Sequence, residues 1–142
     1  MKVKQVSVFL ENKIGRLNEV TRILGEKGIN ISAFSLADTS DFGVLRIIVP
    51  NPEVALSVLK ENHFSAKITD VIMIKSPNKP GTLAKILKIL NSEEVFIEYI
   101  YAYSMDENTA VFVIRPSDLD LCVKKLEKHK DELVSEGGIF MG

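Results

Sequence analysis

Hydrophobic and polar residues follow two different periods along the chain. At the N-terminus, in residues 3–10, apolar positions alternate with polar ones, which is typical of a β-strand. From Leu17 to Gly28 the apolar residues recur every three or four positions, which predicts an amphipathic helix that ends at a glycine. The same criteria predict strands at 29–36 and 43–49, a polar turn at 38–41, a helix at 53–61 and an extended segment at 65–75.

The same order of elements returns in the second half of the chain. A shift of 66 residues, which takes Gly15 to Gly81, aligns residues 12–50 with residues 78–116 without a gap. One inserted residue then continues the match through the second helix. We interpret the match as an internal duplication because identities fall on the turn, the helix stripe and strand interiors. The identical pairs are Asn12/Asn78, Lys13/Lys79, Gly15/Gly81, Leu17/Leu83, Ile23/Ile89, Leu24/Leu90, Ile31/Ile97, Ile48/Ile114 and Pro50/Pro116.

Each half reads strand-helix-strand-strand-helix-strand, with a short last strand predicted at 137–141. This order predicts an α+β fold of two tandem ferredoxin-like βαββαβ units, with antiparallel sheets and the helices on one face. We expect domain boundaries of 1–70 and 71–142. No Pro/Gly/Ser-rich linker separates the halves, so we expect the units to pack side by side and to meet within residues 65–75.

The predicted strands are more apolar than a sheet with one solvated face requires. Residues 47–49 and 111–114 are apolar on both faces, and Tyr99, Tyr101 and Tyr103 line one side of a neighbouring strand. Another sheet is therefore expected to cover part of the helix-free face. We predict a homodimer.

The composition excludes several classes of function. With 46% hydrophobic and 26% charged residues and a net charge of −1, the chain suits a soluble globule and has no basic field for nucleic acid or membranes. The single Cys122 excludes an intrachain disulfide, and the spacing of His63 and His129 does not suit a metal site. No catalytic constellation, metal site or cofactor is predicted. We expect a cytoplasmic protein, because no segment resembles a secretory signal or a membrane span.

The turns at 12–17 and 78–83 are the main candidates for a site. Each follows a predicted strand and opens a predicted helix, where backbone N–H groups lack intrahelical partners and the helix dipole is positive. A small anion, such as the carboxylate of a free amino acid, suits this place. Gly15 and Gly81 allow close approach of a ligand to the backbone, although a tight turn alone also explains them.

Two motifs resemble those of the ACT domain family, the small-molecule-sensing modules of amino-acid metabolism. Asn78-Lys79-Pro80-Gly81-Thr82-Leu83 fits the turn signature of that family, and Gly28-Ile29-Asn30-Ile31-Ser32 fits its second-strand signature. The resemblance covers essentially the whole chain. It implies a tandem of ACT domains without catalytic activity that binds an amino acid or similar zwitterion between two units and acts on a partner enzyme.

The resemblance also implies which residues contact the ligand. In the first repeat these are Asn12, Ile14, Gly15, Arg16 and Leu17 on one wall, with Asn30 and Ile31 on the other. In the second repeat they are Asn78, Gly81, Thr82 and Leu83. The first repeat departs from the family pattern at Ile14, where proline is usual, and the second has Phe96 in place of the asparagine, and Glu98. We therefore expect the first repeat to be the better site.

Simpler roles compete with these assignments. Asn12 and Asn78 can cap the helices that follow them, and Arg16 can be a solvated side chain. Asn30 is harder to explain structurally, because asparagine is depleted in strands.

Rival functions exist on the same scaffold. One variant of the amino-acid-binding function is a regulatory subunit of a biosynthetic enzyme of the acetolactate synthase type. An acylphosphatase-like hydrolase needs a glycine-rich anion loop with an arginine; Arg16 is near that place, but the loop around it does not match. An RNA-binding module of the RRM type needs an aromatic third-strand motif that residues 42–47 and 109–114 lack. The identity of the ligand and ligand binding by the second repeat stay open.

Overall fold

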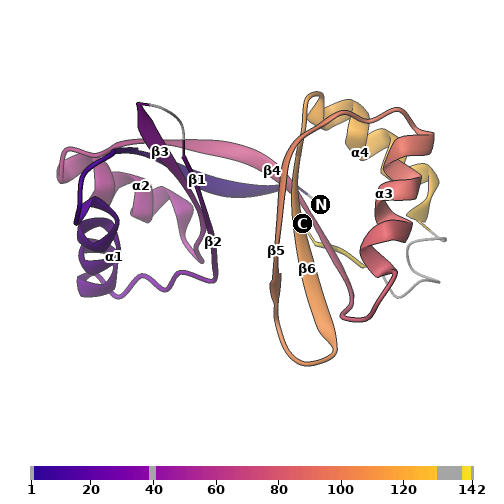
Figure 1. The fold of residues 1–142 in the computed structure, drawn as a ribbon, viewed down its shortest axis with the longest axis horizontal. Coiled ribbons are helices and arrows are strands. Elements are labelled where there is room, and N and C mark those ends of the chain that lie inside the picture. The colour runs from indigo at the N-terminus through magenta and orange to yellow at the C-terminus, as the bar shows by residue number, and fades with distance from the viewer. Residues whose placement is uncertain (1, 39–40, 131–138, 142) are drawn as a thin grey trace. The chain divides into compact units, whose positions relative to one another are not determined.

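The computed structural model describes residues 2–38, 41–130 and 139–141. It divides into an N-terminal unit, Lys4–Thr69, and a C-terminal unit, Asp70–Gly142 with Met1–Val3. Strands β1 (Lys2–Glu11) and β4 (Ser65–Pro77) both contribute residues to the two units. Figure 1 labels the elements, and each unit is described by itself below.

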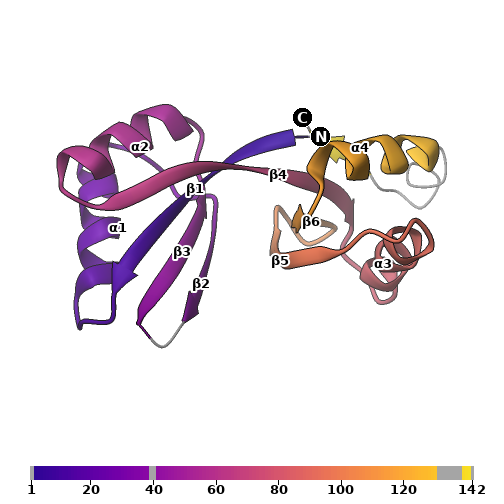
Figure 2. The same ribbon diagram turned by 90° about the horizontal axis from the view of Figure 1, so that it is seen from above.

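The N-terminal unit contains a sheet in the order β2-β3-β1-β4. Both of its helices lie on one face of this sheet, as Figure 2 shows. Val6 of β1 and Phe34 of β2 both lie opposite Ile47 of β3 in antiparallel pairs. A hydrogen bond of 3.1 Å joins the hydroxyl groups of Ser7 and Thr69, from β1 and β4. The remaining elements of the unit are α1 (Arg16–Glu26), β2 (Ala33–Asp38), β3 (Phe42–Ile48) and α2 (Pro52–Glu61).

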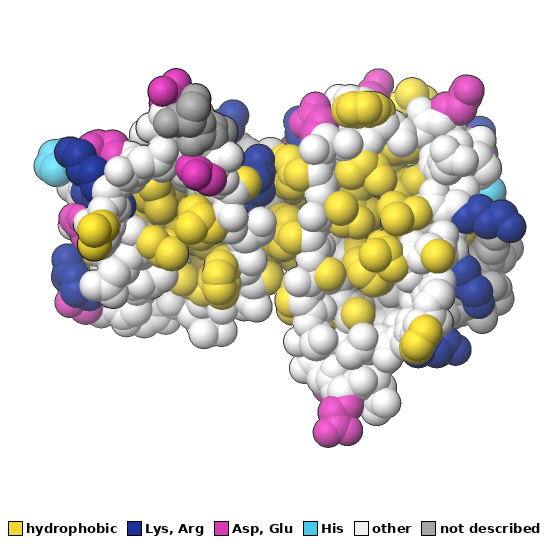
Figure 3. Space-filling view, viewed as in Figure 1, with side chains coloured by type: hydrophobic (Ala, Val, Ile, Leu, Met, Phe, Trp, Pro, Cys, Tyr) yellow, Lys and Arg dark blue, Asp and Glu magenta, His cyan; other side chains and the backbone are white. Residues whose placement is uncertain are grey.

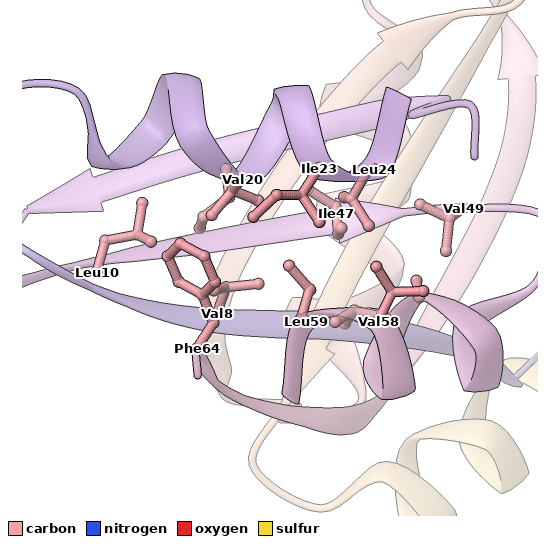
Figure 4. Close-up of a cluster of buried hydrophobic side chains, with 13 residues drawn as sticks. Val8, Leu10, Val20, Ile23, Leu24, Ile47, Val49, Val58, Leu59 and Phe64 are labelled. Carbon is pink, nitrogen blue, oxygen red and sulfur yellow. The ribbon is translucent and has the colours of Figure 1, made fainter. Parts of the chain in front are cut away.

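The core of the N-terminal unit lies between the helices and the sheet (Figure 4). The apolar stripe predicted for the first helix is its buried face, except for Leu17, which is 37% exposed. Phe64, at the start of the segment that leads into β4, closes the end of this core near Leu10 and Val8. The buried members are Val6, Val8, Leu10, Val20, Ile23, Leu24, Leu45, Ile47, Val49, Ala55, Val58, Leu59 and Phe64.

The C-terminal unit repeats this plan with strand order β5-β6-β4, and β7 pairs with β4. Its own core contains Cys122, which is 1% exposed and behaves as a small hydrophobic residue. Burial raises the pKa of the Cys122 thiol to about 11. The elements are α3 (Thr82–Ser92), β5 (Ile97–Ser104), β6 (Thr109–Pro116), α4 (Leu119–Lys128) and β7 (Ile139–Met141).

The predicted fold class is confirmed: each half is an α+β unit with two helices and four strands, of which β4 belongs to both halves, and the pairs β1–β3, β2–β3, β4–β6, β4–β7 and β5–β6 are antiparallel. Of the last strand predicted at 137–141, residues 137–138 lie outside the described part of the chain, as do residues 39–40 of the predicted polar turn. The expected boundaries of 1–70 and 71–142 stay a prediction, as does the homodimer. No helix in the described residues is long and apolar enough to cross a membrane.

Two expectations about the strands are wrong. The second strand begins at Ala33, not at residue 29, so Asn30 and Ile31 precede it. The depletion of asparagine in strands therefore says nothing about Asn30.

The extra residue of the second repeat lies in the hairpin before β6, not after it. Val6 is paired with Ile47, whereas Ile72, 66 residues after Val6, is paired with Ile114, 67 residues after Ile47. The gapless match of Ile48 with Ile114 is therefore wrong. A one-residue slip would turn every side chain of the strand to the opposite face, and a hairpin loop accommodates the insertion without that cost.

Candidate functional site

The predicted turns begin both first helices with the same backbone conformation. Gly15 has φ 93° and ψ −10°, and Gly81 has φ 89° and ψ −15°. Glycine adopts this left-handed conformation without the steric penalty of a Cβ. A Cβ placed on either residue would meet no atom within 4 Å, so neither turn is walled off by neighbouring side chains. The glycines are therefore required by backbone geometry, and the space in front of them is open.

The start of each helix presents free backbone donors to that space. The N–H of Glu19 donates to the Gly15 carbonyl at 2.9 Å, and the N–H of Lys85 donates to the Gly81 carbonyl at 3.1 Å. The N–H groups of the two preceding residues in each helix have no intrahelical acceptor, as at any helix start. In the described residues neither helix has a side-chain N-cap hydrogen bond.

Neither asparagine is therefore the N-cap residue of its helix, and the idea that Asn12 satisfies an N–H group at the helix start stays a prediction. Gly15 and Gly81 are the N-cap residues. Asn78 instead connects its turn to the hairpin between β5 and β6. Its N–H donates to the Asn108 carbonyl at 2.9 Å, and its side-chain amide donates to the Glu107 carbonyl at 3.5 Å.

In the N-terminal unit the turn forms one wall of a cavity of about 580 Å³, called the turn pocket below. Four of the predicted ligand contacts line it: Asn12, Ile14, Arg16 and Leu17. The side chain of Ile14 is fully exposed. The end of β2 supplies the opposite wall. The other lining residues are Leu10, Glu11, Lys13, Leu36, Ala37, Asp38 and Gly43.

Three charged residues of the turn pocket, Glu11, Lys13 and Arg16, take part in ion pairs. Lys13 Nζ lies 2.8 Å from a Glu11 carboxylate oxygen, and this contact holds the pKa of the Glu11 carboxyl below its usual value. Arg16 forms an ion pair of 2.9 Å with Glu19 and lies 3.9 Å from Glu11. Its guanidinium carbon is 4.5 Å from the centre of the Phe64 ring. Arg16 is therefore neither a solvated side chain nor an uncommitted carboxylate binder.

A second cavity, of about 370 Å³, lies between α1 and β2 and is called the groove below. Leu17 lines both the groove and the turn pocket. Figure 3 shows hydrophobic side chains gathered over this part of the N-terminal unit. The predicted contact Ile31 lies in the groove, whereas Asn30 is exposed and lines neither cavity. The lining residues are Leu17, Asn18, Thr21, Ile31, Phe34, Leu45 and Ile47.

The sequence reasoning missed several of these residues. Phe34 is 67% exposed although it lies on the helix-covered face of the sheet, opposite Ile47. The alternation of Phe34 and Leu36 with Ser35 was the available signal, because two large apolar residues of an edge strand share one face. Glu11 and Asp38 gave no signal, since they come from strand ends that meet only in the folded unit.

The comparisons with known proteins agree with this architecture. A family model described as an ACT domain pair matches residues 1–139. The chain belongs to the ACT domain family. The crystal structure of protein BT0572 from Bacteroides thetaiotaomicron is 52% identical to this ACT domain pair, with a TM-score of 0.85, over 92% of this chain and 90% of that chain.

More distant structures share the fold. The regulatory subunit of aspartate kinase from Thermus thermophilus, in a ligand-free form, is 17% identical, with a TM-score of 0.61, over 88% of this chain and 91% of that chain. The corresponding subunit from Thermus flavus is 16% identical, with a TM-score of 0.60, over 90% of this chain and 94% of that chain. None of the curated proteins matches the ACT domain pair.

The second turn of the ACT domain pair has different surroundings. Thr82 stands where the first turn has Arg16, and its side chain is 6% exposed. The nearby Ser76 hydroxyl is buried without a hydrogen-bond partner among the described residues. Leu83 is 41% exposed and Phe96 is 70% exposed. The expectation that the first repeat is the better site stays a prediction.

The described residues of the ACT domain pair contain no group of three or more histidine, cysteine, aspartate or glutamate side chains that could hold a metal ion.

Proposed function

We propose that this ACT domain pair is a regulatory protein that binds a free amino acid in the turn pocket of its N-terminal unit. The observation that carries the proposal is the cavity beside the open helix start: Gly15 itself lines neither cavity, but its turn neighbours Asn12, Ile14, Arg16 and Leu17 line the turn pocket together with further charged side chains. Membership of the ACT domain family supports a regulatory role in general, and the geometry supports this particular place for the ligand.

The chemistry of the pocket suits both charges of a zwitterion. The N–H groups of Leu17 and Asn18 and the positive end of α1 would bind the carboxylate. Asn12 offers both a donor and an acceptor, and the carboxylate of Asp38 on the opposite wall would attract the ammonium group. Ile14, with its exposed side chain, would cover the bound ligand.

The proposal includes no catalytic step. The lysine, the arginine and Glu11 in the pocket are paired with carboxylates or cations of the same unit, which leaves no obvious acid–base pair for a substrate. The paired charges would instead keep the walls of the pocket in one arrangement.

Ligand binding would act by changing how copies of the chain assemble. We propose a homodimer in which a second copy places its Asn30 and Ile31 against the open side of the turn pocket, as the family resemblance implies. A ligand that binds this assembly better than the separate copies would shift the population towards it. The protein would work in the cytoplasm, by itself or as the regulatory subunit of an amino-acid biosynthetic enzyme, and copurification with such an enzyme would distinguish these versions.

A thermal-shift screen with the twenty amino acids tests the proposal. A ligand present at one hundred times its dissociation constant should stabilise the protein by about 2.7 kcal/mol. The absence of any stabilising amino acid, with titration calorimetry in agreement, would contradict the proposed function.

One substitution made in both repeats tests the place of the site. Asn12→Ala should weaken the best ligand by about 1–3 kcal/mol, because it leaves a polar group of the bound ligand without its partner. Asn78→Ala is the matched control and should leave the affinity unchanged. Equal losses in both variants would place ligand at both turns, and a loss in Asn78→Ala alone would move the site to the second repeat.

A further inference from the structure

The groove and the turn pocket of the N-terminal unit are neighbours, because Leu17 lines both cavities. A molecule held beside Leu17 at the helix start would therefore have the groove within reach. The turn pocket is lined by Glu11, Lys13, Arg16 and Asp38, whereas none of the described residues that line the groove is charged. One end of the combined site is therefore charged and the other is apolar.

The groove exists because α1 does not cover the edge strand. Phe34 lies opposite Ile47 and Leu36 lies opposite Leu45, so both side chains are on the face that the helices cover. They are nevertheless 67% and 49% exposed. An uncovered apolar surface of this kind beside a polar pocket is characteristic of a binding site.

The C-terminal unit has larger side chains at two of the positions that correspond to the groove. Leu87 of α3 stands where α1 has Thr21, and it packs against the core of that unit. Phe112, which is 8% exposed and pairs with Ile74, stands where β3 has Leu45. Both replacements are larger. The small Thr21 is therefore one reason that the groove is open in the N-terminal unit.

We propose that the amino acid bound by this protein has an apolar side chain of about the size of leucine or phenylalanine, which lies in the groove against Leu17 and Phe34. This inference rests on the function proposed above. A cavity of about 370 Å³ has room for one such side chain. A charged or amide side chain would be removed from water there, and among the described residues Asn18 and Thr21 are the only polar ones in the lining.

Titration calorimetry on the full chain tests the preference. Leucine, isoleucine, methionine and phenylalanine are compared with glycine, serine, aspartate and lysine. At least one of the apolar group should bind ten times more tightly or better than every member of the second group. If a polar, charged or small amino acid binds as tightly as the best apolar one, the apolar subsite is wrong and the proposed function stands. If no amino acid binds, both fail.

The groove itself is tested by filling it. Thr21→Leu copies the residue of the C-terminal unit at an exposed position of α1. It should weaken the best apolar ligand at least tenfold. Arg22→Leu places the same side chain at the next position of α1, which is exposed and lines neither cavity, and should bind as the wild type does. Unchanged affinity in Thr21→Leu would overturn the proposal.

A second pair of variants removes the apolar wall without filling the groove. Phe34→Ala should also weaken the apolar ligand at least tenfold, and its high exposure means that folding does not depend on the ring. Ile100→Ala changes the equivalent residue of the C-terminal unit, which is 38% exposed, and should leave the affinity unchanged. Circular dichroism confirms that each variant is folded. An equal loss in both variants would overturn the assignment to the N-terminal groove.

Discussion

The backbone conformation is the same in the two units at both ends of the first helix, but different side chains surround it. The left-handed glycines begin both helices. At the other end Gly28 has φ 72° and Glu94 has φ 56°, and the next residue donates its N–H back to a leucine carbonyl at 2.9 Å in both units. The backbone path has thus been kept even where the residue is not glycine.

The side chains around this common path differ in charge and volume. The first turn carries Arg16, held by two carboxylates and the Phe64 ring, where the second carries the buried Thr82. Thr21 and Leu45 line the groove of the N-terminal unit, and the larger Leu87 and Phe112 occupy the equivalent positions of the other unit. A duplicated scaffold can therefore keep its architecture while the surfaces at its turns change. The predictions below challenge or sharpen this comparison, beginning with the largest effect.

Because the two units share one architecture, we expect equivalent core substitutions to lower the free energy of unfolding by similar amounts. Leu24→Ala and Leu90→Ala each remove a side chain that is no more than 1% exposed, so each should lower the free energy of unfolding by about 2–5 kcal/mol. Urea unfolding measures the loss. Leu83→Ala, at a position that is 41% exposed, is the control and should cost less than either. A loss below about 1 kcal/mol at one position only would contradict equivalent packing.

The charged cluster is specific to the first turn. Arg16→Ala should cost about 1–2 kcal/mol of stability, because it removes the contact with Phe64, the pairing with Glu19 and the packing of the aliphatic stem. Thermal unfolding at fixed ionic strength measures it. Arg22→Ala removes an exposed arginine paired with Glu26 on the same helix and should cost less than about 0.5 kcal/mol. If Arg16→Ala and Arg22→Ala lowered the stability equally, the stacking of Arg16 on Phe64 would contribute nothing to the stability.

The helix ends offer reciprocal substitutions. Glu94→Gly should stabilise the protein by about 0.5–1 kcal/mol, because glycine adopts a positive φ without strain. Gly28→Ala should destabilise it by about 1 kcal/mol for the opposite reason. Denaturant midpoints measure both changes. Loss of stability in Glu94→Gly would mean that the side chain of Glu94 makes a contribution larger than the strain of its backbone.

The smallest expected effect concerns Glu93, which stands where the first unit has Lys27. A hydrogen bond of 3.1 Å with His129 is the main cause that holds the pKa of the Glu93 carboxyl below its usual value of 4.5. Because this pKa is lower in the folded protein, the stabilisation is present above about pH 4.5 and is lost as the pH falls through the folded value.

Glu93→Gln tests this pH dependence. The melting temperature of the variant should fall below that of the wild type at pH 6, and the difference should shrink at pH 3. A difference that is constant between these pH values would exclude a contribution from the ionised carboxylate.

The fold was predictable because its signals are local. The stripe of Val20, Ile23 and Leu24 and the glycines at both ends of the helix specify where α1 begins and ends. The recurrence of the pattern specified the duplication. The start of β2 at Ala33 was not predictable, because Ile29 and Ile31 are as apolar and β-branched as strand residues, and only pairing with β3 decides which residues join the sheet.

The candidate site was predictable in part. Four turn residues of the first repeat do line one cavity, because they are close in sequence and the turn holds them together. The walls of the groove come from α1, β2, β3 and Ile31, and no sequence spacing indicated that they meet. The correspondence between β6 and β3 also depended on the hairpin before each strand. A gapless alignment assumes that the two hairpins have the same length, and they differ by one residue.

The sequence alone determined the elements, the left-handed turns and the repetition of one unit, since these follow from periodicity and from the steric freedom of glycine over a few residues. Tertiary structure alone decided that Phe64 lies under Arg16 and that Phe34 is left uncovered. Such contacts join residues that are distant in the chain, and they are selected by the packing of helices on a sheet. Tertiary packing therefore paired the charged side chains of the first turn and left the groove beside that turn open.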